Sequence, residues 1–125
     1  MIDNLIIETT VKTPEVKLNS NGFLEISGKS IPENSIAFYQ PLYAWIDNYA
    51  TNPAAKTELK ISLEYFNTSS SKCLLDVLRK LDVLNKSGKS SVSVTWYYED
   101  GDDDMLEAGD DYKSLVPLPF SFMKV

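Results

Sequence analysis

The chain has 125 residues, of which 43% are hydrophobic and 24% are charged, proportions typical of a folded globular domain. This length predicts a single domain over residues 1–125. The formal charge is −6, from 18 acidic and 12 basic residues, and no block of Lys or Arg interrupts the sequence. Because affinity for nucleic acids rests largely on phosphate neutralisation, we expect no nucleic-acid partner.

The sequence contains no histidine and one cysteine, Cys73. Zinc sites that use histidine, Ser-His-Asp triads and Cys-His dyads are therefore excluded within this chain, as is an internal disulfide. Glu64 and Glu99 remain as candidate bases, but no nucleophile, base and orienting group can be assembled around them. We expect no enzyme, no metal and no cofactor.

No apolar run approaches the ~20 residues that span a bilayer, so no membrane insertion is expected. The first residues, Met1-Ile2-Asp3-Asn4, lack the basic start of a secretion signal. Together these features predict a cytoplasmic protein.

The first third of the chain predicts strands and then a helix. Residues 1–12 are expected to form an edge strand or an extended arm. Two alternating runs, 15–19 and 23–28, flank Asn21-Gly22, which predicts an antiparallel hairpin. Ser30 and Glu33 have the spacing of a capping box, and Pro41 predicts a helix that restarts there and runs to about Ala50. Four aromatic residues near this helix predict core packing, with a recognition patch as the alternative: Phe38, Tyr39, Tyr43 and Trp45.

Residues 56–66 alternate as a central strand, with Tyr65 predicted on the apolar face and Phe66 on the polar face. One strongly apolar face favours helices packed on a single side of the sheet. A leucine-rich helix is expected from about Ser69 to Lys86, in which Cys73 is interpreted as a small buried residue, the alternative being a thiol with a lowered pKa.

Residues 91–98 predict another strand, parallel to the central one. The acidic stretch 99–111 has one alternative interpretation, a calcium loop that begins with Asp100, Asp102 and Asp104. Met105 stands where such a loop needs glycine, so a solvated acidic helix start is the better interpretation. A helix to about Leu115 and an edge strand over 118–122, with Pro119 inside it, complete the prediction.

A hydroxyl-rich turn joins the central strand to the leucine-rich helix: Asn67, Thr68, Ser69, Ser70, Ser71 and Lys72. Spacing alone favours Thr68 or Ser69 as an N-cap, since most Ser/Thr clusters before helices are caps. One hydroxyl suffices for a cap, however. The alternative is a phosphorylated hydroxyl, because a helix N-terminus stabilises an anion and Lys72 lies one turn further on.

The element order β-β-α-β-α-β-α-β predicts an α/β (α+β) fold with a mixed four- to five-stranded sheet and helices mainly on one face. This order resembles the STAS-like, anti-sigma-factor-antagonist architecture. Four stretches sharpen the resemblance, which covers about residues 13–122: Pro32 to Tyr39, Pro41 to Trp45, Tyr65 to Lys72, and Val94 to Asp100. Together they resemble the SiaC family of bacterial regulatory phosphoproteins.

This resemblance implies a non-catalytic partner switch. It implies that Thr68 is phosphorylated by a dedicated kinase and dephosphorylated by a PP2C-type phosphatase, with Ser69 and Ser70 as alternative acceptors. It also implies that the unmodified form binds and activates a diguanylate cyclase, which raises cyclic di-GMP and promotes biofilm formation. The partner is expected to contact the turn itself, from Asn67 to Lys72. The alternatives are a STAS-like small-molecule or nucleotide sensor and an anti-sigma-factor-antagonist-type regulator.

Overall fold

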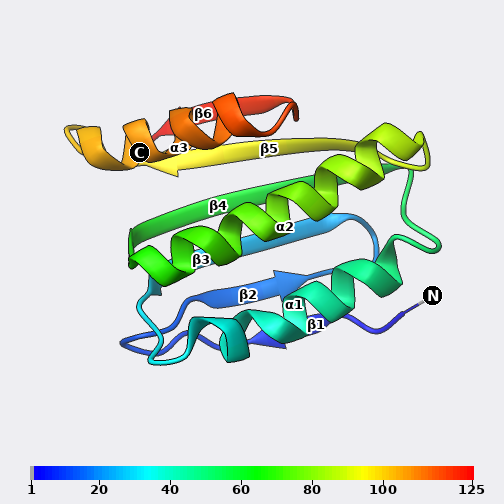
Figure 1. Ribbon diagram of the computed structural model, residues 1–125, viewed down its shortest axis with the longest axis horizontal. Coiled ribbons are helices and arrows are strands. Elements are labelled where there is room, and N and C mark those ends of the chain that lie inside the picture. The colour runs from blue at the N-terminus through cyan, green and yellow to red at the C-terminus, as the bar shows by residue number, and fades with distance from the viewer. Residues whose placement is uncertain (1) are drawn as a thin grey trace.

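A computed structural model describes residues 2–125 and shows an α/β fold with three helices and one mixed sheet (Figure 1). The sheet has six strands, one more than the largest number predicted. The sixth comes from residues 1–12, expected to be an edge strand or an extended arm, in which three residues form a short strand at the edge of the sheet. The elements in chain order are β1 (Leu5–Ile7), β2 (Glu15–Leu18), β3 (Phe23–Ser30), α1 (Ser35–Tyr49), β4 (Lys56–Phe66), α2 (Thr68–Ser87), β5 (Ser91–Tyr98), α3 (Asp103–Leu115) and β6 (Phe120–Lys124).

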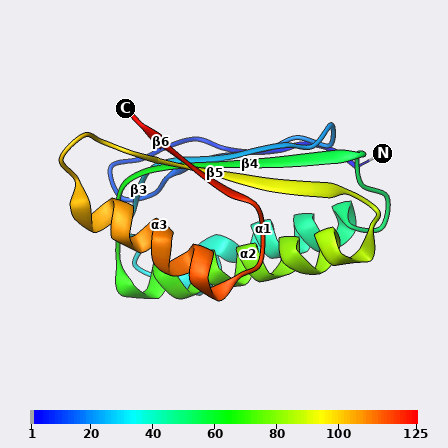
Figure 2. The ribbon, with the colours of Figure 1, turned by 90° about the horizontal axis from the view of Figure 1, so that it is seen from above.

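The six strands lie side by side in sequence order, with β1 to β3 antiparallel and β3 to β6 parallel. All three helices cover the same face of this sheet, as predicted from the single apolar face of β4 (Figure 2). The core lies between the sheet and the helices, and its largest fully buried side chains include Trp96, Tyr39 and Tyr49. No helix in the described part of the chain is both long enough and apolar enough to cross a membrane.

The predicted hairpin between β2 and β3 is confirmed, and Gly22 explains its turn. Gly22 has φ of +103°, and a Cβ there would lie 2.1 Å from the backbone oxygen of Lys56. The Gly22 carbonyl also accepts a hydrogen bond of 2.8 Å from the N–H of Glu58. The absence of a side chain therefore lets the turn lie directly against the start of β4.

The end of β4 differs from the prediction because the strand contains a β-bulge. Gly28 pairs with Leu63 but Lys29 pairs with Tyr65, so Glu64 has no partner in β3. One extra residue reverses the alternation of side chains beyond it. Tyr65, predicted to face the core, is 57% exposed, whereas Phe66 turns toward the helices.

The predicted start of the first helix is wrong. The capping side chain belongs to Asn34, whose Oδ1 accepts from the N–H of Ala37 at 3.1 Å, and Ser30 is the last residue of β3. The helix does not restart at Pro41 but continues through it. The buried stripe lies on both sides of the proline, so core packing offsets the lost backbone hydrogen bond. That stripe is Tyr39, Leu42, Trp45, Ile46 and Tyr49.

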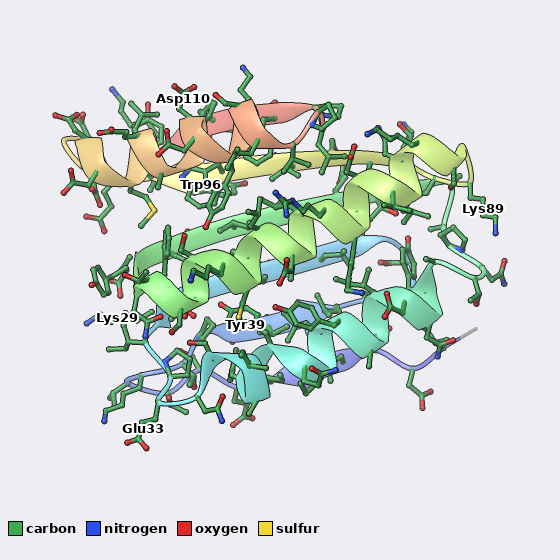
Figure 3. The ribbon with its side chains drawn as sticks, viewed as in Figure 1. Lys29, Glu33, Tyr39, Lys89, Trp96 and Asp110 are labelled. Atoms are coloured by element: carbon green, nitrogen blue, oxygen red, sulfur yellow. The ribbon has the colours of Figure 1, made fainter. Side chains whose placement is uncertain are left out.

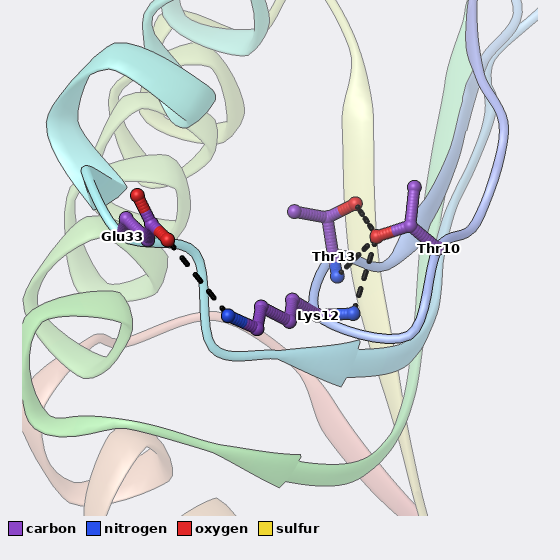
Figure 4. Close-up of polar contacts among 4 residues, drawn as sticks. All are labelled: Thr10, Lys12, Thr13 and Glu33. Atoms are coloured by element: carbon purple, nitrogen blue, oxygen red, sulfur yellow. Dashed lines mark hydrogen bonds and ion pairs between the residues drawn. The ribbon is translucent and has the colours of Figure 1, made fainter.

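The loop between β1 and β2 is held against the loop that precedes α1. The Thr10 hydroxyl accepts hydrogen bonds from the N–H groups of Lys12 and Thr13 and lies 2.6 Å from the Thr13 hydroxyl (Figure 4). The Lys12 carbonyl accepts from the N–H of Ile31 at 2.8 Å. The Lys12 ammonium also lies 3.8 Å from the Glu33 carboxylate. These contacts fix the entry into α1.

The acidic segment is a helix start, as expected. Asp102 is the N-cap of α3, its Oδ1 accepting from the N–H of Met105 at 3.0 Å, and two further aspartates occupy the first turn. The last strand begins at Phe120, so Pro119 lies just before it, and this strand is an edge of the sheet as predicted.

Candidate functional site

The first turns of all three helices lie at one end of the molecule. Strands β3, β4 and β5 are parallel, and each is followed by a helix, so α1, α2 and α3 all begin at the carboxyl ends of these strands. Figure 3 marks this end by Lys29 and Glu33, with Lys89 at the opposite end. Carboxyl ends of parallel strands are the usual location of sites in open α/β sheets.

The hydroxyl-rich turn forms the first turn of α2, and its cap is Asn67. The Asn67 Oδ1 accepts from the N–H of Ser70 at 2.9 Å, and the Asn67 backbone N–H donates to the Ser30 carbonyl at 3.0 Å. The interpretation of Thr68 or Ser69 as the N-cap is therefore wrong. An asparagine already satisfies this donor, and the four hydroxyls need another explanation.

The three serines after Thr68 each bond within the fold. Ser70 is fully buried, and its hydroxyl donates to the Ser30 carbonyl at 3.1 Å. Ser71 faces α3, where the Tyr112 hydroxyl donates to its carbonyl at 2.8 Å and lies 3.2 Å from its hydroxyl. The Ser69 hydroxyl is bonded on the opposite side, to the first turn of α1. These serines join α2 to β3, α3 and α1.

Buried hydroxyls continue this network into the core. The Ser30 hydroxyl donates to Ser70 at 2.9 Å and lies 2.7 Å from the Tyr39 hydroxyl. Figure 3 shows Tyr39 between α1 and α2. Burial raises the pKa of Tyr39 to about 12, and the hydrogen bond with Ser30 opposes that rise in part. The phenol is therefore a neutral, fixed member of the network.

Thr68 is the exception among the four hydroxyl residues. Its side chain is exposed, as is that of Ser69, but within residues 2–125 the Thr68 hydroxyl makes no hydrogen bond. As the first residue of α2, it lies where the helix dipole places partial positive charge. An anion on this hydroxyl would be close to backbone N–H groups that have no intrahelical acceptor.

Thr68 lines a groove between the first turns of α1 and α2, with a volume of about 810 Å³. The exposed Ile36 contributes an apolar side chain from α1, and Lys72 and Asp76 contribute opposite charges from α2. The full lining is Ile36, Tyr43, Asn67, Thr68, Ser69, Lys72, Cys73 and Asp76. The unmodified groove is therefore largely apolar and carries two charges that offset each other.

The structure brings together four of the six residues predicted to contact a partner: Asn67, Thr68, Ser69 and Lys72 line the groove. Ser70 lies beneath it, and Ser71 lies on the side of α2 that faces α3. Sequence reasoning missed Ile36 and Ser35 in the first turn of α1. Their place in the first turn follows from Asn34 as the N-cap of α1, whereas the spacing in the sequence predicts a capping box at Ser30 and Glu33.

The remaining candidates form no site of their own, although Cys73 also contributes to the lining of the groove. Cys73 is buried, as predicted for a small core residue. Glu64 and Glu99 are exposed. Among residues 2–125 no group of three or more Asp, Glu, His or Cys side chains is placed to hold a metal ion.

Comparison with known proteins matches this chain along nearly its whole length. SiaC of Pseudomonas aeruginosa superposes with a TM-score of 0.89 at 27% identity, covering 99% of this chain and 100% of that one. The crystal structure of diguanylate cyclase SiaD in complex with its activator SiaC, from the same species, matches with a TM-score of 0.90 at 28% identity, covering 97% and 99%. An uncharacterised protein of that species is 28% identical over 121 residues, which are 96% of this chain and 95% of the relative.

The sequence profile of the SiaC family regulatory phosphoproteins matches residues 7–125. This match includes the hydroxyl-rich turn, the groove and every strand from β2 onward. The chain belongs to the SiaC family of regulatory phosphoproteins.

Proposed function

We propose that this protein is a non-catalytic regulator that binds and activates a diguanylate cyclase, and that phosphorylation of Thr68 abolishes the binding. The observation that carries this proposal is the state of the four hydroxyls at the start of α2. Thr68 is exposed, unbonded and in the groove, whereas Ser70 is buried and Ser69 and Ser71 are bonded within the fold. Thr68 is therefore the acceptor that a kinase can reach without breaking a hydrogen bond.

The cyclase is proposed from the family and from the structural neighbour. That neighbour is a SiaC bound to the diguanylate cyclase SiaD as its activator, and this chain superposes on it over 97% of its length. A raised level of cyclic di-GMP and biofilm formation would follow in the host. A cognate kinase, a PP2C-type phosphatase and action in the cytoplasm belong to the same proposal.

The charge of the groove supplies the mechanism. Lys72 and Asp76 offset each other in the unmodified groove, so a partner with an apolar surface meets little net charge. Phosphorylation adds about −1.5 to −2 charges at pH 7. Docking would then desolvate an unpaired anion, and a penalty of about 3 kcal/mol lowers affinity by roughly a hundredfold.

The fold itself tolerates the modification. The side chain of Asn67 accepts from the N–H of Ser70, which leaves the N–H groups of Thr68 and Ser69 as donors for the phosphate. The switch therefore changes the docking surface and leaves the domain folded.

The test compares unmodified protein, protein with phosphothreonine at position 68, and Thr68→Asp. We expect the two charged forms to lose cyclase binding by roughly a hundredfold while their thermal midpoints stay near that of the wild type. Thr51→Asp is the matched control, because Thr51 is exposed at the opposite end of the sheet and its substitution adds the same charge. Equal binding of modified and unmodified protein would reject the switch.

A further inference from the structure

The side chain of Ser35, in the first turn of α1, bonds directly to the phosphorylatable turn of α2. Its hydroxyl lies 2.7 Å from that of Ser69 and 3.4 Å from that of Ser70. Ser35 is only 3% exposed, so it cannot itself contact a docked protein to any extent. Ser69, in contrast, lines the groove beside Thr68.

Two proton arrangements satisfy the short Ser35–Ser69 contact. In one, Ser69 donates to the Oδ1 of Asn67 at 3.2 Å, so Ser35 donates to Ser69. In the other, Ser69 donates to Ser35 and Ser35 donates to Ser70 at 3.4 Å. Ser70 donates to the Ser30 carbonyl in both, so the Ser35–Ser69 bond is present in either arrangement.

The same bond joins the two walls of the groove at their first turns, and the Tyr43 hydroxyl, which donates to the Cys73 carbonyl at 3.3 Å, joins them further along the helices. Ser35 immediately precedes Ile36, the exposed apolar residue of the α1 wall, and Ser69 immediately follows Thr68 on the α2 wall. No salt bridge joins these two first turns within residues 2–125. The Ser35 end of this bond is buried, and because an unpaired buried hydroxyl is costly, the bond holds the two first turns in a fixed relation.

We propose that the Ser35–Ser69 hydrogen bond is a latch that sets the spacing of Ile36 and Thr68 across the groove, so that the buried Ser35 is a positioning residue for the partner. The proposal rests on the proposed function only where it names the cyclase as that partner. A residue 33 positions before the phosphorylatable threonine thus controls a surface that it does not touch.

The chain provides a matched control at the other end of the sheet. There the hydroxyl of Tyr49 lies 2.8 Å from that of Thr57, which lies 2.6 Å from that of Ser90. Ser90 is 4% exposed, close to the 3% of Ser35, and it bonds to a neighbouring hydroxyl in the same way. Ser90→Ala therefore removes an equivalent buried hydroxyl far from the groove.

The first measurement needs no partner. Amide hydrogen exchange of Ser35→Ala and Ser69→Ala is expected to be about fivefold faster than in wild type at Phe38 and Ser71, whose N–H groups close the first turns of α1 and α2. Ser90→Ala is expected to leave these two amides unchanged. Equal exchange in Ser35→Ala and Ser90→Ala at these two amides would overturn the latch.

The second measurement is a double-mutant cycle in cyclase affinity. Ser35→Ala and Ser69→Ala are each expected to weaken binding about fivefold, the double variant no more than either single one, and Ser90→Ala less than twofold. Additive losses, or normal binding by Ser35→Ala, would overturn the proposal. If wild type binds no cyclase, the proposed function fails, and the exchange experiment alone decides the latch.

Discussion

Gly109 of α3 lies directly against the indole of Trp96 on β5. A Cβ on Gly109 would lie 2.6 Å from Cδ1 and 2.7 Å from Nε1 of that ring, closer than side-chain carbons approach. The indole cannot yield, because it is fully buried and its N–H donates to the Met105 carbonyl at 2.9 Å. Figure 3 shows Trp96 beside α3.

Gly109→Ala is therefore expected to destabilise the protein by about 1–3 kcal/mol, although alanine favours a helix by about 1 kcal/mol over glycine. Denaturant unfolding measures the change. Asp110→Ala is the control, since Asp110 is exposed on the same helix and its substitution is expected to alter stability by less than about 0.5 kcal/mol. Increased stability of Gly109→Ala would show that α3 can move away from the indole.

The bulge at Glu64 predicts opposite effects for two adjacent aromatic residues. Phe66 packs edge-on to Trp96, with ring centroids 6.2 Å apart, whereas Tyr65 is 57% exposed. Phe66→Ala is expected to cost about 2–4 kcal/mol and Tyr65→Ala less than about 1 kcal/mol, as measured by thermal or denaturant unfolding. The reverse order would mean that β4 alternates without a bulge.

Buried tyrosines predict a loss of stability at alkaline pH. The pKa of Tyr39 is raised from 10.0 to about 12 by burial, and burial also raises the pKa of Tyr43 and Tyr112. The unfolded chain therefore releases these protons first, so the stabilisation is complete below pH 10 and decreases as pH rises toward 12.

Tyr39→Phe removes one of these groups. We expect it to be about 1 kcal/mol less stable than wild type near pH 7, because it loses the hydrogen bond with Ser30. Between pH 9 and pH 11.5, however, it is expected to lose about 1–2 kcal/mol less than wild type does. Parallel stability curves for the two proteins over this range would contradict the role of the buried phenol.

The order of the elements was predictable because periodicity and turn residues point the same way along most of the chain. Asn21-Gly22 marked a hairpin, the alternation of β4 marked one covered face, and Asp102 began a helix as its charge suggested. Such segments can be predicted from the sequence because their local pattern agrees with the packing of the whole fold.

The errors arose where tertiary packing overrides a local rule. Pro41 normally ends a helix, but a buried stripe on both sides of it carries α1 through. Tyr65 continues the apolar alternation of β4, yet the bulge at Glu64 depends on pairing with Gly28, far away in sequence. Neither the packing of that stripe nor the pairing with Gly28 can be recognised from the few residues around Pro41 or Tyr65.

The site was predicted only in part for the same reason. The turn from Asn67 to Lys72 was visible as a cluster of hydroxyls, and the resemblance selected Thr68 from it. Which hydroxyls are bonded depends on Ser30, Ser35 and Tyr112, which come from three other elements. Only the folded chain separates the unbonded threonine from the bonded serines beside it.

The strand directions also determine which terminus is suited to an affinity tag or a fluorophore. Ile2 lies beside Tyr49 and Asn52, at the end of the sheet remote from Thr68, whereas Val125 pairs with Tyr98 at the carboxyl end of β5 (Figure 1). An affinity tag or fluorophore joined ahead of residue 2 would therefore stand clear of the groove. The same attachment after residue 125 would lie at the same end of the sheet as the groove, so an amino-terminal tag or label is the better choice for pull-downs and titrations.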